Sequence, residues 1–203
     1  DNVFAICTMD CGEYNNIHPV DKRTPGERLG NCALHQVYGM SRIPVYGPTV
    51  LGFRCDEGGR VRLFFRYAHG LHFSGTTPDS YGDKFDKNLP SLVRLPERSG
   101  FELAGADGVF HPATAAIFVD CDIDDLINAK VNVVDYNATE FGIPINSRSI
   151  GTITLATPEV PAPVMMRYAW RSWGPAPLVN DNDLPAHPFK LDLTDHTDSD
   201  HAE

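Results

Sequence analysis

The 203 residues suffice for one large domain, or for one domain and part of another, and a hydrophobic fraction of 42% is enough for a real core. The formal net charge of −10 argues against nucleic-acid or anionic-membrane binding, because both need clustered lysine and arginine. No signal peptide is visible, and no apolar run approaches the roughly 20 residues that span a bilayer, so we expect no membrane partner.

The chain opens with an apolar run that predicts a buried strand. Only Thr8 is polar between Val3 and Met9, a pattern typical of a parallel strand covered on both faces. Such a strand needs a sheet to join, yet it begins two residues after Asp1. We therefore expect residues 1–40 to be the last piece of a larger α/β domain whose earlier strands are absent from this chain, through processing or truncation.

A helix is predicted after this strand. Thr24 can serve as N-cap, Pro25 occupies the first helical position, and Glu27 follows the threonine by three residues to complete a capping box. Apolar residues then recur at helical spacing, and Gly39 is a natural terminator. The predicted order is buried strand, long loop, helix.

The loop between these two elements, GEYNNIHP at residues 12–19, contains His18. In open α/β sheets, the loops that leave the carboxyl ends of strands form the ligand crevice. The position of His18 therefore suits a catalytic imidazole.

Beyond residues 40–47 the periodicity changes from 3.6 to 2, and prolines and glycines stop any continuing helix. Residues 75–100 are rich in Gly, Pro, Ser and Asp and are expected to form a long surface excursion that covers or flanks the active site. Repeated short strands favour an antiparallel sandwich or jelly roll. The predicted strands are Thr49–Cys55, Val61–Tyr67, Phe101–Leu103, Val109–Phe110, Thr114–Val119, Val131–Val134, Ile150–Ala156 and Val164–Trp170.

Metal and disulfide chemistry find little support in the sequence. The cysteines, Cys7, Cys11, Cys32, Cys55 and Cys121, include no CxxC pair, so we expect no zinc site, no other metal and no cofactor. Cys7 and Cys32 fall at apolar positions and are expected in the core. Cys11 could pair with a part of the protein outside this chain.

The histidines other than His18 are expected to have structural roles. His69 and His72 fall on opposite faces of an extended stretch, which is poor geometry for a metal. His35, on the predicted helix, is expected to be exposed or to lie between domains.

Several motifs, taken in order, resemble the sialate O-acetylesterases, carbohydrate esterases of the SGNH-hydrolase superfamily. They cover nearly the whole chain: TMDCGEYNNIHPVDKRTPGERL from residue 8, VYG from 37, FELAGADGVFHPA from 101, VMMRYAW from 164 and LPAHPF from 184. The resemblance implies that residues 1–40 close an α/β SGNH domain and that residues 41–190 form a C-terminal β-sandwich domain. Residues 191–203 are then an acidic, solvated tail.

The resemblance also implies that His18, in the IHP motif, is the general base of a serine esterase that removes O-acetyl groups from sialic acid or a related glycan. The serine nucleophile of the family lies far upstream of that histidine, and no serine of this chain stands in a matching motif. The implied partners are an upstream segment of the same protein and an acetylated sugar. The implied location is secreted, periplasmic or lysosomal.

The residue that orients His18 is left open. Asn15 stands where many SGNH enzymes carry an aspartate three residues before the histidine, and Asn16 stands where relatives often carry one. Asp10, Glu13 or a backbone carbonyl could support the ring instead, and we expect Asp10 to be structural because it ends the predicted strand.

A second reading is a non-catalytic β-sandwich that binds carbohydrate or packs on a partner, with residues 1–40 as a structural remnant. Tyr168, Trp170 and Trp173 could stack on a sugar ring, although a core or interface position is favoured. A serine block of the SGNH type immediately upstream would decide for the enzyme.

Overall fold

The computed structural model describes residues 3–13, 16–74, 92–93, 98–119, 132–133, 150–172 and 174–194. Within these ranges, the helix α1 spans Arg23–Gln36, and no described helix is long and apolar enough to cross a membrane. The strands are β1 (Thr49–Asp56), β2 (Arg60–Arg66), β3 (His72–Phe73), β4 (Leu92–Val93), β5 (Phe101–Ala104), β6 (Phe110–Pro112), β7 (Thr114–Val119), β8 (Asn132–Val133), β9 (Gly151–Ala156), β10 (Met165–Tyr168), β11 (Leu178–Val179) and β12 (Phe189–Asp192).

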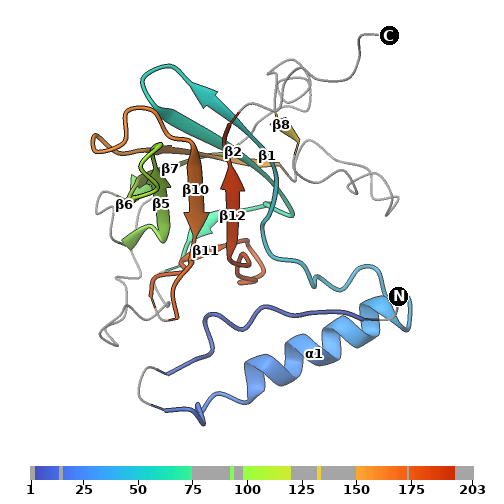
Figure 1. The fold of residues 1–203 in the computed structure, drawn as a ribbon. Coiled ribbons are helices and arrows are strands. Elements are labelled where there is room, and N and C mark those ends of the chain that lie inside the picture. The colour runs from blue at the N-terminus through green and yellow to red at the C-terminus, as the bar shows by residue number, and fades with distance from the viewer. Residues whose placement is uncertain are drawn as a thin grey trace.

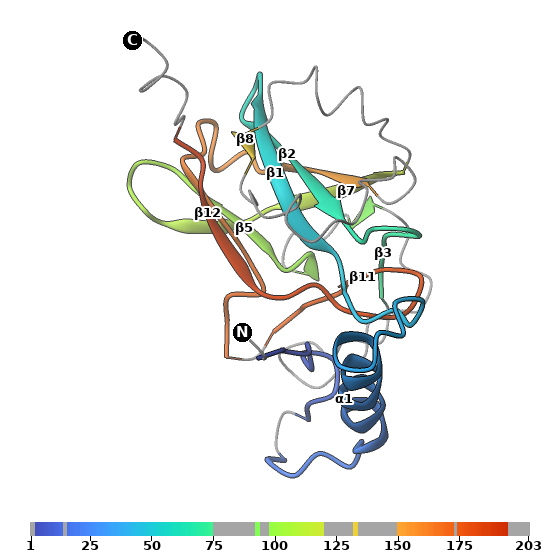
Figure 2. The same ribbon diagram turned by 90° about the vertical axis from the view of Figure 1, so that its right-hand side faces the viewer.

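Two antiparallel sheets hold most of these strands (Figure 1). The six-stranded sheet has the order β4-β7-β9-β2-β1-β8, and the four-stranded sheet has the order β12-β10-β5-β6. A small third sheet pairs β11 with β3. The helix α1 and the segment before it lie together at one end of this β part, outside its sheets (Figures 1 and 2).

One hydrophobic core lies between the two large sheets. Inward side chains of β2 and β9 meet those of β5, β10 and β12 in a single buried cluster. The rings of Phe65 and Phe189 lie 6.0 Å apart between the two sheets, and those of Phe101 and Tyr168 lie 4.6 Å apart within one of them. The fully buried Tyr168 hydroxyl accepts a hydrogen bond from the Leu178 amide at 2.8 Å. The predicted β-rich C-terminal part is confirmed.

Most predicted strands that fall on described residues are present within a residue or two of the expected bounds. The turn between β1 and β2 uses Gly58 and Gly59 with φ of 75° and 73°, a backbone that favours glycine. The outer face of β2 is partly covered, since Phe64 there is only 1% exposed. Residues 75–91 and 94–97 of the predicted surface excursion lie outside the described residues.

The C-terminal boundary at residue 190 falls too early. Strand β12 continues to Asp192, and Leu191 and Leu193 are 7% and 5% exposed in the core. The cause is the strand alternation of FKLD, which places every second side chain inward. Residues 195–203 of the predicted tail lie outside the described residues.

The prediction of a buried strand at residues 3–9 is wrong for this structure. Residues 3–8 form no strand, and Val3 and Phe4 are 87% and 43% exposed. An apolar run pairs as a strand only where a neighbouring strand offers its backbone groups. The described part of the chain provides no such neighbour here, although Met9 packs against the β core.

The predicted capping box is also wrong. The helix begins at Arg23, and the Thr24 amide donates to Oδ1 of Asp21 at 3.0 Å, so the aspartate and not the threonine satisfies a first-turn donor. Glu27 instead forms an ion pair with Arg23 one turn earlier, at 2.7 Å. Gly39, with φ of 72°, follows the end of the helix as expected.

Candidate functional site

The His18 loop, residues 10–20, joins the N-terminal segment to α1. Its tip residues Tyr14 and Asn15 lie outside the described residues, so the predicted orienting role of Asn15 stays a prediction. Apart from the buried Cys11 at its start, the described loop residues are exposed or half-buried, and they include the apolar Ile17 and Val20 beside polar residues. Local hydrogen bonds therefore determine its shape.

The Glu13 carboxylate holds the two arms of this loop together. One oxygen accepts from the Val20 amide at 2.7 Å, and the other accepts from Nδ2 of Asn16 at 3.0 Å. These hydrogen bonds, the one from Val20 first, hold the pKa of Glu13 below its usual range. The carboxylate is therefore ionised at neutral pH, the form that accepts both hydrogen bonds.

Asn16 extends this network to the histidine. Its Oδ1 accepts a hydrogen bond from the His18 backbone amide at 2.9 Å. Asn16 thus fixes the backbone of His18 and does not contact the ring.

The His18 imidazole is exposed and makes no hydrogen bond or ion pair with any residue that the structure describes. The two carboxylates considered as its support, Asp10 and Glu13, bind other groups. The imidazole thus projects from a backbone fixed by hydrogen bonds, and a reacting group can approach it, as general-base catalysis requires.

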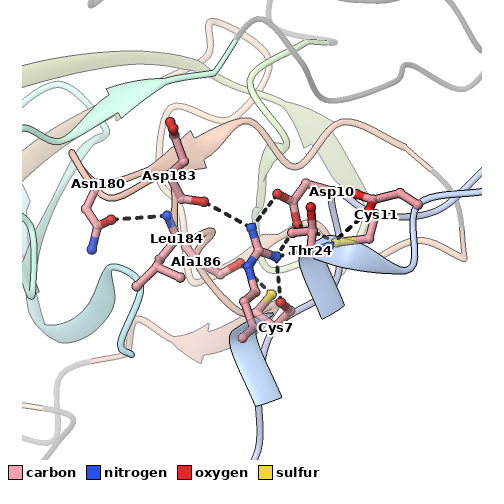
Figure 3. Close-up of polar contacts among 10 residues, drawn as sticks. Cys7, Asp10, Cys11, Thr24, Asn180, Asp183, Leu184 and Ala186 are labelled. Atoms are coloured by element: carbon pink, nitrogen blue, oxygen red, sulfur yellow. Dashed lines mark hydrogen bonds and ion pairs between the residues drawn. The ribbon is translucent and has the colours of Figure 1, made fainter. Parts of the chain in front are cut away.

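Asp10 forms a two-pronged ion pair with Arg28 of α1 (Figure 3). The two guanidinium nitrogens donate to the two carboxylate oxygens at 2.6 and 2.7 Å. The side chains are only 18% and 10% exposed, so water screens this pair weakly. Asp10, the first residue of the His18 loop, is thus bonded to the helix through Arg28 and not to the His18 imidazole.

Of the two thiols near the start of the His18 loop, Cys11 is buried and Cys7 is half-buried. Burial first, and then the neighbouring Asp10 carboxylate, raise the pKa of Cys11 to about 12. Burial also raises the pKa of Cys7, whose Sγ lies 3.7 Å from the carbonyl of Ala186. No disulfide joins two of the four cysteines in the described residues. The predicted core position holds for Cys32, which is 8% exposed, but not for Cys7, which is half-buried.

A shallow hollow lies between the N-terminal segment and the four-stranded sheet, where Met9, Gly100, Glu102, Trp170 and Arg171 contribute to its lining. Trp170 is 51% exposed beside it. Of the other aromatic candidates, Tyr168 is fully buried in the core, and Trp173 lies outside the described residues.

The Glu102 carboxylate in this hollow is 6% exposed and receives hydrogen bonds from Arg167 and Arg171, each at 2.6 Å. Burial works to raise the pKa of Glu102, but the two arginines outweigh burial, so this pKa lies below its usual range. The wall of the hollow therefore carries the Glu102 carboxylate, paired with two arginines, next to the exposed indole of Trp170.

Three other histidines contact nearby oxygen atoms. Nδ1 of His69 lies 2.6 Å from the Asp181 carboxylate, and Nδ1 of His72 lies 2.8 Å from the Gly70 carbonyl. His35 is half-buried, with Nδ1 2.7 Å from the Ile43 carbonyl. In the described part of the chain, no three His, Cys, Asp or Glu side chains gather as a metal site would require.

Sequence reasoning did not single out Arg28 as part of the site. A signal was present, because Arg28 and Cys32 are four residues apart and share a helix face. An arginine on the face that buries a cysteine needs a carboxylate partner.

Comparison with known proteins gives one informative result. No protein-family model matches the sequence, and no curated protein matches it. Among solved structures, 90% of the chain matches a carbohydrate acetylesterase from Xanthomonas citri at 27% sequence identity with a TM-score of 0.57. The chain spans 31% of the length of that enzyme. This similarity supports a relationship to the carbohydrate esterases.

Proposed function

We propose that this chain is the C-terminal part of a carbohydrate esterase, in which His18 is the general base for a serine carried by an upstream segment of the same protein. The observation that carries the proposal is the exposed His18 imidazole on a loop whose backbone is tied by Glu13 and Asn16. The similarity to a carbohydrate acetylesterase supports the reaction class.

In this mechanism the imidazole takes the proton of the serine hydroxyl as the oxygen attacks the acetyl carbonyl. The protonated ring then donates that proton to the sugar oxygen as its bond to the acetyl carbon breaks, which leaves an acetyl-serine and a free sugar hydroxyl. The neutral ring next takes a proton from the water molecule that hydrolyses this acetyl-serine. Asn16 and Glu13 hold the His18 backbone in place. The groups that stabilise the oxyanion belong to the upstream segment.

The surface that would receive the upstream segment is apolar. Most of the exposed large hydrophobic residues of the described chain lie within residues 3–40, where such a segment would cover them. They are Val3, Phe4, Ile17, Val20, Leu29, Val37, Tyr38 and Met40. The apolar face predicted for α1 is thus uncovered, since Leu29 is 59% exposed, which supports residues 1–40 as the closing piece of an SGNH-type domain.

More specifically, we propose that the substrate is an O-acetylated sialic acid or a related glycan. The ordered series of motifs from residue 8 to residue 189 supports this choice. A panel of O-acetylated sialic acids and acetylated neutral sugars, hydrolysed by the full-length protein, tests this choice. Faster hydrolysis of the neutral sugars would be consistent with an esterase but would refute the proposal that sialic acid is the substrate.

The test of the catalytic role is His18→Ala in the full-length protein that includes the upstream segment. We expect turnover of an acetyl ester to fall at least about a thousandfold, the scale of losing a triad base, with little change in folding because the side chain is exposed. His72→Ala, which also removes an exposed imidazole, is the matched control. A His18→Ala variant that keeps more than about a tenth of the activity removes this residue from the mechanism.

A non-catalytic sugar-binding module is the second candidate, favoured by the exposed indole of Trp170 beside the hollow. Glycan binding that Trp170→Ala abolishes, together with no ester hydrolysis by the full-length protein, would decide for the module.

A further inference from the structure

The Arg28 guanidinium lies where three segments of the chain meet (Figure 3). From α1 it donates to the Cys7 carbonyl at 2.8 Å and to both oxygens of Asp10. It also donates to the Asp183 carbonyl of the β part at 3.1 Å, across 155 positions of sequence. With the side chain only 10% exposed, this single group ties the start of the His18 loop to the distant turn.

The turn that offers the Asp183 carbonyl is itself fixed. Asn180, 3% exposed at the end of β11, accepts through Oδ1 from the amides of Asn182 and Leu184 at 3.1 and 3.2 Å. Its Nδ2 group donates to two more backbone carbonyls, those of residues 46 and 67, at 2.9 and 3.1 Å. Asp183 has φ of 54°, a backbone shape that persists only where the surroundings determine it.

On the opposite side of Arg28, Asp10 begins the His18 loop. Three residues further along the backbone, Glu13 accepts from Asn16, which in turn accepts from the His18 amide. The ion pair of Asp10 with Arg28 therefore fixes the start of the loop, and the hydrogen bonds of Glu13 and Asn16 fix its backbone nearer to His18.

We propose that Arg28 is a positioning residue, which uses the turn at residues 180–184 as a fixed support to place the His18 loop. This inference rests on the proposed function. A misplacement of about 1 Å at a reacting group can cost about a hundredfold in rate, so a loosened loop lowers kcat without weakening substrate binding to the same degree. The guanidinium fork matters as well as the charge, because an ammonium cannot bond both Asp10 oxygens and the Asp183 carbonyl in this planar pattern.

The experiment compares Arg28→Lys and Asp10→Asn with Arg23→Lys in the full-length protein. Arg23 is the matched control, since it lies on the same helix and forms an ion pair at 2.7 Å, but its side chain is 85% exposed. We expect kcat to fall at least about tenfold in the first two variants, with KM changed less than about threefold, and to stay unchanged in the control. Arg28→Ala is expected to be slower than Arg28→Lys.

Hydrogen exchange gives a second measurement that needs no activity. The amides of His18 and Val20, both hydrogen-bonded within the loop, should exchange faster in Arg28→Lys and Asp10→Asn than in Arg23→Lys, while core amides of β2 and β9 keep their protection. Asp10→Asn, close to the native shape, serves where Arg28 variants fold poorly.

Unchanged loop exchange in folded Arg28→Lys and Asp10→Asn proteins overturns the inference, whatever the activity. A kcat within twofold of wild type in both variants overturns it too, as does a loss of kcat that only follows the unfolded fraction. A wild-type protein without esterase activity would refute the proposed function alone, and the exchange data would still decide whether Arg28 fixes the loop.

Discussion

Replacing Asn180 with alanine tests the energetic importance of the turn that follows β11. The Asn180 side chain makes four hydrogen bonds, two donated to the carbonyls of Tyr46 and Tyr67 and two accepted from the amides of Asn182 and Leu184. At about 0.5–1.5 kcal/mol each, the four contribute about 2–6 kcal/mol. Asn182 is exposed, so water can replace the bond to its amide, and we expect the free energy of unfolding to fall by about 2–4 kcal/mol.

Urea unfolding of the 203-residue chain, followed by circular dichroism and tryptophan fluorescence, measures this loss. The control is Asn182→Ala, two residues away, whose exposed side chain bonds only the neighbouring Asp181 carboxylate among the contacts shown, and whose loss should be within about 0.5 kcal/mol. A fall of less than about 1 kcal/mol for Asn180→Ala, or equal falls for the two variants, would refute the assigned role of these hydrogen bonds.

Two further predictions follow from pKa shifts. Arg167 and Arg171 hold the folded-state pKa of Glu102 below the ordinary value of 4.5, so this stabilisation is present above pH 4.5 and is lost as the pH falls through the lower folded pKa. Wild-type stability should therefore fall more steeply between pH 7 and pH 3 in urea titrations than that of Glu102→Gln, and parallel curves would contradict this. In iodoacetamide labelling at pH 8 read by mass spectrometry, exposed Cys55 should react well before Cys11, whose pKa is about 12, and equal rates would mean that the Cys11 site opens.

The β part could be predicted because its signals are local. Alternating side chains predicted the strands that became β1 and β2. Strands of two residues, such as β3 and β11, carry no such alternation and were missed. Only their pairing, Leu178 with Phe73 and Val179 with His72, defines them.

The N-terminal segment shows the limit of the same reasoning. Apolar residues at positions 3–9 indicate that burial is favourable, but they do not say which surface provides it. For the site, the motif pointed to the His18 loop, and Asp10 was expected to be structural. Its partner Arg28 was not predicted, and neither was the contact of Arg28 with the Asp183 carbonyl. A contact between residues 155 positions apart produces no periodic pattern in the sequence.

The bond between Arg28 and Asp183 also sets an order of events during synthesis. The ribosome completes the His18 loop within the first tenth of this chain, but the carbonyl that Arg28 needs is made only after β11. Closing so long a segment carries an entropic cost that the nascent chain cannot offset until both large sheets have formed. The His18 loop, which is synthesised before the β part, would thus be among the last parts of this chain to reach its final geometry.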